Sequence, residues 1–301
     1  MQALRNNQTF QGVTLAVLAA LLWSGNFIIS RAVSNDIGPV TLAFYRWLAA
    51  SLIIAPFAWK KFQEEKAIVK ANSRYLLFAS LTGITLFNTF VYIAGHYTSA
   101  INMALIGTTS SPIFATIMAA IFLKEKMNAF RFAGLIICIS GILLLIANGS
   151  WSKLAAFHFS KGDLWILAGA FSFALYNIQV RRKPAGISAV NFLFVIFAAG
   201  TLMLFPFYVK ELLFDAPVKW SSSLLLSVLY LGAGTSVTAF LCWNLSIQKL
   251  GAGRTVLFGN LIPVFSIFEA VLLLGEKLTT AHIISSTLVI TGLIIANLKH
   301  K

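Results

Sequence analysis

The chain has 301 residues, of which 58% are hydrophobic and 11% charged, whereas typical soluble domains contain roughly 45–50% and about 25%. A mean hydropathy of +0.84 indicates that lipid rather than water surrounds most of the folded chain. This excludes a soluble globule, a disordered protein and a secreted disulfide scaffold. The net charge of +14 is typical of basic cytoplasmic loops, so no nucleic-acid partner is expected.

Apolar runs broken by charge, glycine and proline predict ten membrane-spanning helices, because one span needs about 20 apolar residues. The predicted ranges are 12–33, 40–59, 75–95, 100–123, 130–147, 162–180, 189–209, 223–246, 253–274 and 281–298. The runs are continuous and do not alternate with a period of two, which excludes a transmembrane barrel. The first run is too long for the apolar region of a signal peptide, so we expect it to remain as an uncleaved span.

The distribution of Lys and Arg among the loops predicts how the spans are oriented. The loop between the second and third spans alone carries Lys60, Lys61, Lys66, Lys70 and Arg74. With the N-terminus inside, this loop and most other Lys and Arg fall on the cytoplasmic side, as the positive-inside rule requires. Both termini are therefore predicted to be cytoplasmic.

The two halves of the chain, 1–150 and 151–301, resemble each other. The strongest local match sets Pro112-Ile-Phe against Pro263-Val-Phe, and in each case a Glu-Lys pair, at 125–126 or 276–277, begins eleven positions after the Phe. Other identical pairs, 151 residues apart, are Asn26 and Asn177, Gly83 and Gly234, Phe114 and Phe265, and Gly141 and Gly292. Each half holds five predicted spans, an odd number, so the second half must be inverted in the membrane. Inverted repeats occur in secondary transporters, with the substrate site near the midplane between the halves.

A family resemblance is carried by motifs that occur near the end of each half. These are Tyr97-Thr-Ser-Ala with Leu123-Lys-Glu-Lys, and Lys249-Leu-Gly-Ala with Leu274-Gly-Glu-Lys; Leu22-Trp-Ser-Gly-Asn-Phe opens the first half. On these residues nearly the whole chain resembles the EamA-type members of the drug/metabolite transporter superfamily, and most closely the YddG-like amino-acid exporters of bacterial inner membranes. The resemblance implies ten helices around a central cavity, a multi-pass protein of the bacterial inner membrane, and export of small solutes.

Polar and aromatic side chains within the spans are the candidate binding residues, because polar groups inside a membrane usually face a cavity or a neighbouring helix. In the third span Thr85, Asn88, Tyr92 and His96 share one helical face, which predicts a cavity lining or, alternatively, hydrogen bonds between helices. The expected substrate-binding residues are Trp23, Asn26, Arg46, Asn88, Tyr92, His96, Thr109, Tyr176, Asn177, Trp243, Asn244 and Asn260. Aromatic faces beside amide groups suit a small ligand with an apolar side chain.

Two prolines and two charges inside the spans allow more than one interpretation. Pro112 and Pro263 each remove a hydrogen bond in mid-span, so they predict either hinges or static kinks. Arg46 and Glu269 are expected to pair with each other. The alternative is that Arg46 attracts a substrate carboxylate and Glu269 an amine or a proton. Glu125 and Glu276, at the ends of two spans, are expected to be anchoring caps.

The expected function is export of small zwitterionic solutes, neutral or aromatic amino acids, by alternating access. A drug or nucleotide-sugar transporter of the same fold is the nearer alternative. A membrane-embedded enzyme is the remote alternative, because the sequence contains no HExxH, GxSxG or GKS/T motif and its histidines are scattered. No catalytic residue, metal or cofactor is expected. The expected partners are the substrate and the lipid bilayer, with a monomer as one open possibility.

Overall fold

The computed structural model describes residues 2–122, 129–147, 149–150, 152, 160–215, 217–250, 255, 258–259 and 261–296. Within these residues every regular element is helical and no strand occurs, which confirms the predicted all-α class. The helices of the first half are α1 (Gln2–Ala32), α2 (Pro39–Ala71), α3 (Ser73–Ser80), the π-helix η1 (Leu81–Leu86), α4 (Phe87–Gly95), α5 (Ala100–Phe122) and α6 (Ala129–Ile146). Those of the second half are α8 (Lys161–Arg181), α9 (Ala189–Phe214), α10 (Ser222–Leu229), the π-helix η2 (Tyr230–Thr238), α11 (Ala239–Leu250), α13 (Leu261–Leu274) and α14 (Thr280–Ala296).

Each of the ten predicted ranges overlaps one or more of these helices, and α2 extends twelve residues beyond the predicted end at 59. Among the described residues, six continuous helical stretches are long and apolar enough to cross a membrane, namely Thr9–Ala32, Pro39–Ala71, Ser73–Gly95, Lys161–Val180, Ala189–Phe214 and Ser222–Ser246. Three shorter apolar helices are Phe132–Leu145, Leu261–Leu274 and Thr280–Gly292. Two of the long stretches combine three elements each, because η1 joins α3 to α4 and η2 joins α10 to α11.

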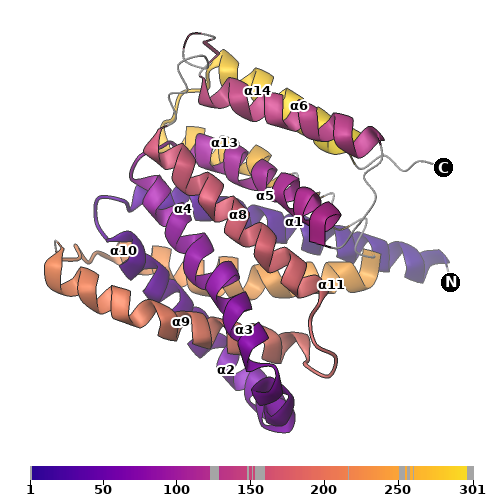
Figure 1. Ribbon diagram of the computed structural model, residues 1–301, viewed down its shortest axis with the longest axis vertical. Helices are drawn as coiled ribbons and strands as arrows, with labels where there is room; N and C mark the ends of the chain where they lie inside the picture. Colours follow the sequence, from indigo (N-terminus) through magenta and orange to yellow (C-terminus); the bar gives the residue numbers. More distant parts are fainter. Residues whose placement is uncertain are drawn as a thin grey trace.

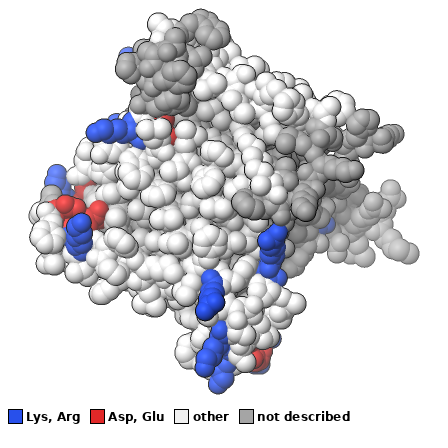
Figure 2. Space-filling model, in the orientation of Figure 1, with Lys and Arg blue, Asp and Glu red and all other residues white. Residues whose placement is uncertain are grey.

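The outer surface of the helices is apolar. Phe57, Leu202 and Leu273 are each more than 70% exposed, although exposed apolar patches on soluble proteins are normally small. Figure 2 shows the Lys, Arg, Asp and Glu side chains gathered toward the margins of the face in view, with a broad area free of charge between them. Such a surface suits contact with lipid chains.

Several helices begin where the sequence supplies a start signal. Pro39 is the first residue of α2, where its missing N–H costs no hydrogen bond. Ser160 and Asp163 form a capping box at the start of α8, in which each side chain accepts a backbone N–H of the other residue. The Ser221 hydroxyl accepts the backbone N–H of Leu224 at the start of α10. These signals fix the helix boundaries locally.

Two antiparallel pairs, each with one helix from either half, lie at opposite ends of the molecule (Figure 1). The pair α6 and α14 lies at the top of the view, and the pair α2 and α9 lies at the bottom. The helices between them follow a related pattern, because α1 packs on α11 and α13 whereas α8 packs on α4 and α5. Ser51 and Thr201, 150 residues apart, share a 3.4 Å hydrogen bond between α2 and α9.

Small residues let α6 and α14 approach each other closely. A Cβ atom added at Gly292 would lie 2.7 Å from the Gly134 carbonyl oxygen and 2.7 Å from Cys138 Sγ. The Cys138 thiol donates to the carbonyl of Val289 at 3.5 Å, again across 151 positions. Close backbone approach through glycine is a common way of joining helices in lipid, where no hydrophobic force drives them together.

Candidate functional site

The centre of the candidate site is Arg46, which projects from α2 and is only 3% exposed. Its Nη1 donates to the Oδ1 atoms of Asn26 on α1 and Asn88 on α4, the latter at 2.7 Å, and to Tyr92 Oη on α4 at 2.7 Å. Its Nε donates to Ser236 Oγ on η2 at 2.9 Å. The Tyr92 hydroxyl donates in turn to Asn26 Oδ1 at 3.2 Å. Four helical segments therefore meet at one guanidinium, and we call these five residues the Arg46 network.

All the side-chain partners of Arg46 are neutral. Among the described residues one salt bridge forms, between the exposed side chains of Lys61 and Glu64, and it does not involve Arg46. Hydrogen bonds to a charged group contribute about 1.5–3 kcal/mol each, so the neutral oxygens can hold the guanidinium in place. They do not cancel its charge, and the site therefore favours an anionic group.

The expected ion pair between Arg46 and Glu269 does not form. Glu269 lies on α13, which packs against α1, and its Oε1 is 2.8 Å from Ser24 Oγ on α1. The same Ser24 Oγ lies 2.6 Å from the carbonyl oxygen of Leu21. Glu269 Oε2 is buried and has no hydrogen-bond partner among the described residues. The two intramembrane charges are thus held by separate neutral groups.

A chain of aromatic rings runs beside the Arg46 network. The ring of Trp23 lies 5.0 Å from that of Trp243 and 5.5 Å from that of Phe240, and its Nε1 donates to the carbonyl of Thr235 at 3.0 Å. On the other side Trp47 lies beneath the guanidinium, 4.6 Å from Arg46 Cζ. Aromatic surface next to a buried cation suits a ligand that combines a carboxylate with an apolar side chain.

Gly25 allows a further aromatic residue to reach α1. A Cβ atom at this position would lie 2.5 Å from Tyr230 Oη, so the tyrosine can occupy this place only because residue 25 has no side chain. The Tyr230 hydroxyl donates to the carbonyl of Leu22 at 2.9 Å. Gly25 therefore allows η2 to approach α1 closely.

Several predicted site residues lie outside the Arg46 network. His96 is exposed at the end of α4, and Tyr176 on α8 lies against Gly83 and Phe173. Asn177 and Asn244 are partly buried away from the network. Thr109 is fully buried, and its hydroxyl has no hydrogen-bond partner among the described residues. Asn260 and Glu125 lie outside the described residues.

The two prolines occupy different positions in their helices. Pro112 lies inside α5, which continues through it, whereas Pro263 is the third residue of α13. Pro263 therefore lies in a first turn rather than in mid-span as expected. The carbonyl of Gly259, four residues before it, accepts the N–H of Ile262 at 3.1 Å. A first helical turn tolerates proline because its N–H groups have no partner within the helix.

Sequence reasoning missed Ser24 and Ser236. Ser236 could have been found, because it lies 151 positions after Thr85 and so corresponds to a residue of the polar stripe in the third span. Ser24 gave no comparable signal, since a single serine in an apolar helix commonly bonds to its own backbone. Ser24 contacts Glu269 only because α13 packs against α1, and the sequence does not show which helices are neighbours.

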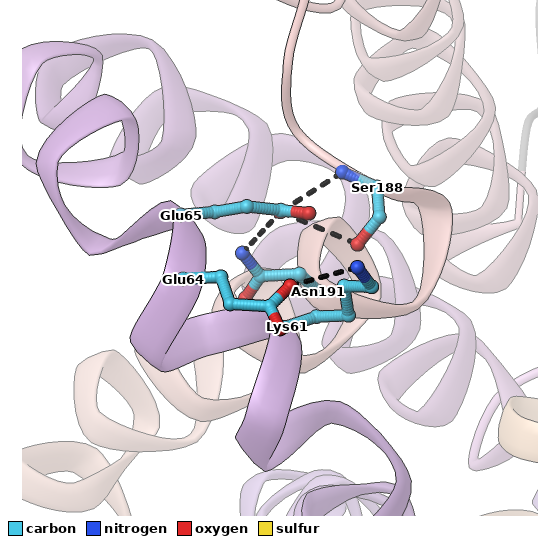
Figure 3. A network of polar contacts seen from close by, with 5 residues as sticks. All are labelled: Lys61, Glu64, Glu65, Ser188 and Asn191. Carbon is cyan, nitrogen blue, oxygen red and sulfur yellow. Dashed lines mark hydrogen bonds and ion pairs between the residues drawn. The ribbon is translucent and has the colours of Figure 1, made fainter.

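Three glutamates cap the N-termini of helices in the other half of the chain. Glu65 accepts the backbone N–H of Ser188 at 2.9 Å, the Ser188 hydroxyl at 3.2 Å and the Asn191 amide at 2.7 Å, as Figure 3 shows. Glu211 accepts the backbone N–H groups of residues 40 and 41. Glu276 accepts those of residues 100 and 101, at 2.7 and 3.1 Å, so it caps the start of α5 rather than the end of the span that it follows.

Two pockets open near the ends of the helices. One, of about 380 Å³, is lined by Tyr45, Tyr208 and Trp220 among others, and the second, of about 440 Å³, lies between Arg31, Tyr97 and Glu276. Neither is lined by a member of the Arg46 network. The Arg46 side chain is thus buried and is not reached from either of these two pockets.

Comparison with known proteins gives consistent results. The model of the EamA-like transporter family matches residues 10–147 and 160–298. The chain is 27% identical over 292 residues to an uncharacterized transporter of Archaeoglobus fulgidus, covering 95% of this chain and 96% of the relative. It is 24% identical over 288 residues to a probable amino-acid metabolite efflux pump of Escherichia coli, covering 93% of each. A solved crystal structure with 18% identity superimposes with a TM-score of 0.61 over 97% of this chain and 96% of the other, a likeness of fold alone.

Proposed function

The chain belongs to the EamA-like transporter family, and we propose that it exports small zwitterionic solutes, neutral or aromatic amino acids, by alternating access. The observation that carries the substrate class is Arg46, a buried cation held only by neutral side chains. A substrate carboxylate can neutralise this charge, and the rings of Trp23 and Trp243 offer apolar surface to a side chain. The efflux-pump relative supports the same substrate class.

The charge at the centre weighs against the alternative substrates. A lipophilic cation would be repelled by Arg46, and an unpaired charge inside a membrane is costly. A nucleotide sugar carries more than one negative charge and would need several cations near the centre. Arg46 is the one cation of the described hydrogen-bonded network, so a single carboxylate fits best.

We also propose ten membrane spans arranged as two inverted repeats, 1–150 and 151–301, with both termini in the cytoplasm of a bacterial cell. Three observations support this organisation. The family model matches the chain twice, once in each half. The π-helices η1 and η2 occupy corresponding places in the two halves. Contacts between residues 150 or 151 positions apart occur in both antiparallel pairs, at Ser51 with Thr201 and at Cys138 with Val289.

Movement of the two halves would open the central site to one side at a time. The buried position of Arg46 and the pockets near the helix ends support a closed state between two open ones. In this cycle Pro112 is proposed as a hinge because it interrupts the hydrogen bonding of α5, and Pro263 because it lies where α13 begins.

An exchange assay tests the proposed function. Proteoliposomes preloaded with unlabelled phenylalanine, threonine or methionine should take up the same labelled amino acid faster than empty vesicles. Arg46→Gln should abolish this uptake, whereas Lys210→Gln, at an exposed cation on α9, should not change it. If lipophilic cations or nucleotide sugars exchange and none of the three amino acids does, the proposed substrate class is wrong.

A further inference from the structure

We propose that Glu269 carries the coupling proton of transport and is protonated in the conformation described here. The inference rests on the proposed transport function and deepens it by naming the driving ion. Entry of a proton through Glu269 would accompany export of a substrate molecule. Three features of the structure support it. Ser24 has a single hydroxyl hydrogen for two acceptors, Glu269 Oε2 has no hydrogen-bond partner among the described residues, and α1 contacts both Glu269 and Arg46.

The two short contacts of Ser24 are both full hydrogen bonds only when Glu269 supplies a proton. Ser24 Oγ lies 2.6 Å from the carbonyl oxygen of Leu21 and 2.8 Å from Glu269 Oε1. A hydroxyl has one hydrogen to donate, and the carbonyl can only accept. If Ser24 donates to the nearer carbonyl, the contact with Glu269 is a hydrogen bond only when the carboxyl donates. A protonated Glu269 satisfies both contacts, whereas an ionised Glu269 leaves two acceptors competing for one hydrogen.

The second oxygen of the carboxyl group agrees with a neutral acid. Glu269 Oε2 is buried and has no hydrogen-bond partner among the described residues. An ionised carboxylate would place negative charge on this atom, which is unfavourable without a donor or a cation. In a protonated carboxyl group with its hydrogen on Oε1, Oε2 is an uncharged carbonyl oxygen, and leaving it without a partner costs far less.

No charged side chain of the described residues forms an ion pair with Glu269, so the carboxyl group can gain and lose a proton without breaking one. Helix α13 packs against α1 and α5. In α1 the charged residues Arg5 and Arg31 lie near the two ends, and α5 has no titratable residue in its sequence. Tyr230 on η2 packs against α1 at Gly25, and its hydroxyl donates to the carbonyl of Leu22. Arg46 itself is hydrogen-bonded elsewhere.

One short segment of α1 connects the proton site to the proposed substrate site. Ser24 contacts Glu269, and Asn26, two residues later, contacts Arg46. A substrate carboxylate that binds Arg46 competes with Asn26 for the guanidinium, and a displacement of Asn26 would move Ser24 with it. The same movement would open Glu269 to water on the cytoplasmic side, and because hydration stabilises the carboxylate, the proton would be released there. It takes up a proton from the outer side after the substrate has left, so each cycle exchanges a proton for a substrate molecule.

Uptake driven by a pH gradient tests this coupling. Proteoliposomes with an acidic lumen, their membrane potential clamped by valinomycin and equal potassium, should accumulate whichever labelled amino acid of the panel exchanges. One-for-one coupling supports up to about tenfold accumulation per pH unit. In Glu269→Gln the ratio of uptake with and without the gradient should fall to about one, whereas Glu64→Gln, an exposed glutamate on α2, should keep the wild-type ratio.

Failure of the coupling can be told apart from failure of the proposed function. Exchange by the wild type without accumulation under the gradient would refute the proton coupling and leave the transport function standing. If no panel member exchanges, the transport function fails, and infrared spectroscopy still decides whether Glu269 is protonated. The spectrum of wild type minus Glu269→Gln at neutral pH should show the C=O stretch of a protonated carboxyl group.

A difference spectrum that contains only carboxylate bands would overturn the proposal. Should Glu269→Gln fail to fold, Ser24→Ala provides a second test, because it removes the hydrogen-bond partner and retains the carboxyl group. The C=O band of the wild type should then move to the frequency of a free carboxyl group. An unchanged band in Ser24→Ala would also contradict the proposal.

Discussion

Glu64 and Glu65 are adjacent residues of α2 with different surroundings, and replacing each by alanine tests how the two halves are joined. Glu65 accepts three hydrogen bonds from Ser188 and Asn191 at the start of α9 (Figure 3), whereas Glu64 pairs with Lys61 at the surface. Loss of an N-cap costs about 0.5–2 kcal/mol, and loss of a negative charge at a helix N-terminus about 0.3–1 kcal/mol. Because Glu65 is only partly buried, solvent screening reduces the second contribution. We therefore expect Glu65→Ala to lower the free energy of unfolding by about 1–2 kcal/mol.

The measurement is equilibrium unfolding of the purified protein by SDS in mixed micelles, followed by circular dichroism. Glu64→Ala is the control and should leave the transition unchanged, because exposed ion pairs contribute little. Glu65→Gln should fall between the wild type and Glu65→Ala, since the amide keeps an acceptor but loses the charge. If Glu64→Ala destabilises the protein as much as Glu65→Ala, the contacts in Figure 3 do not join the halves as described.

Three further predictions concern other parts of the molecule. Tyr92→Phe removes a 2.7 Å hydrogen bond to the buried guanidinium of Arg46. It should lower the free energy of unfolding by about 1.5–3 kcal/mol, measured by the same SDS titration. An unchanged unfolding transition would show that this hydrogen bond does not stabilise the protein. Gly292→Ala should lower the melting temperature, because the added Cβ atom would lie 2.7 Å from the backbone carbonyl oxygen of Gly134. Gly169→Ala is the control and should leave the melting temperature unchanged, since its Cβ atom would have no contact below 3.4 Å. Equal effects of the two substitutions would count against the close approach of α6 and α14. Cysteines introduced at Ser152 and Gln63 should react with a membrane-impermeant reagent from the outside and from the inside, respectively, and labelling of both from one side would refute the proposed topology.

The positions of the helices follow from the sequence alone. Each predicted range overlaps a described helix, because a long apolar segment must satisfy its own backbone hydrogen bonds in lipid and only a helix does so locally. The sequence also placed Asn88 and Tyr92 correctly on one face, since both lie in the regular helix α4 and four residues separate them. Both donate or accept hydrogen bonds within the Arg46 network.

Tertiary structure decided which residues meet, because depth in the membrane and helical phase do not identify the neighbouring helix. Arg46 and Glu269 were expected from the sequence to pair, yet they contact different neighbours and do not pair. The π-helix η1 also changes the phase of the third span: Thr85 contacts the Gly200 carbonyl on α9, while Asn88 in the following α-helix contacts Arg46. A π-turn contains more residues than an α-turn and rotates the side chains that precede it relative to those that follow. The extra residue depends on packing against other helices, so a regular helical period read from the sequence could not reveal it.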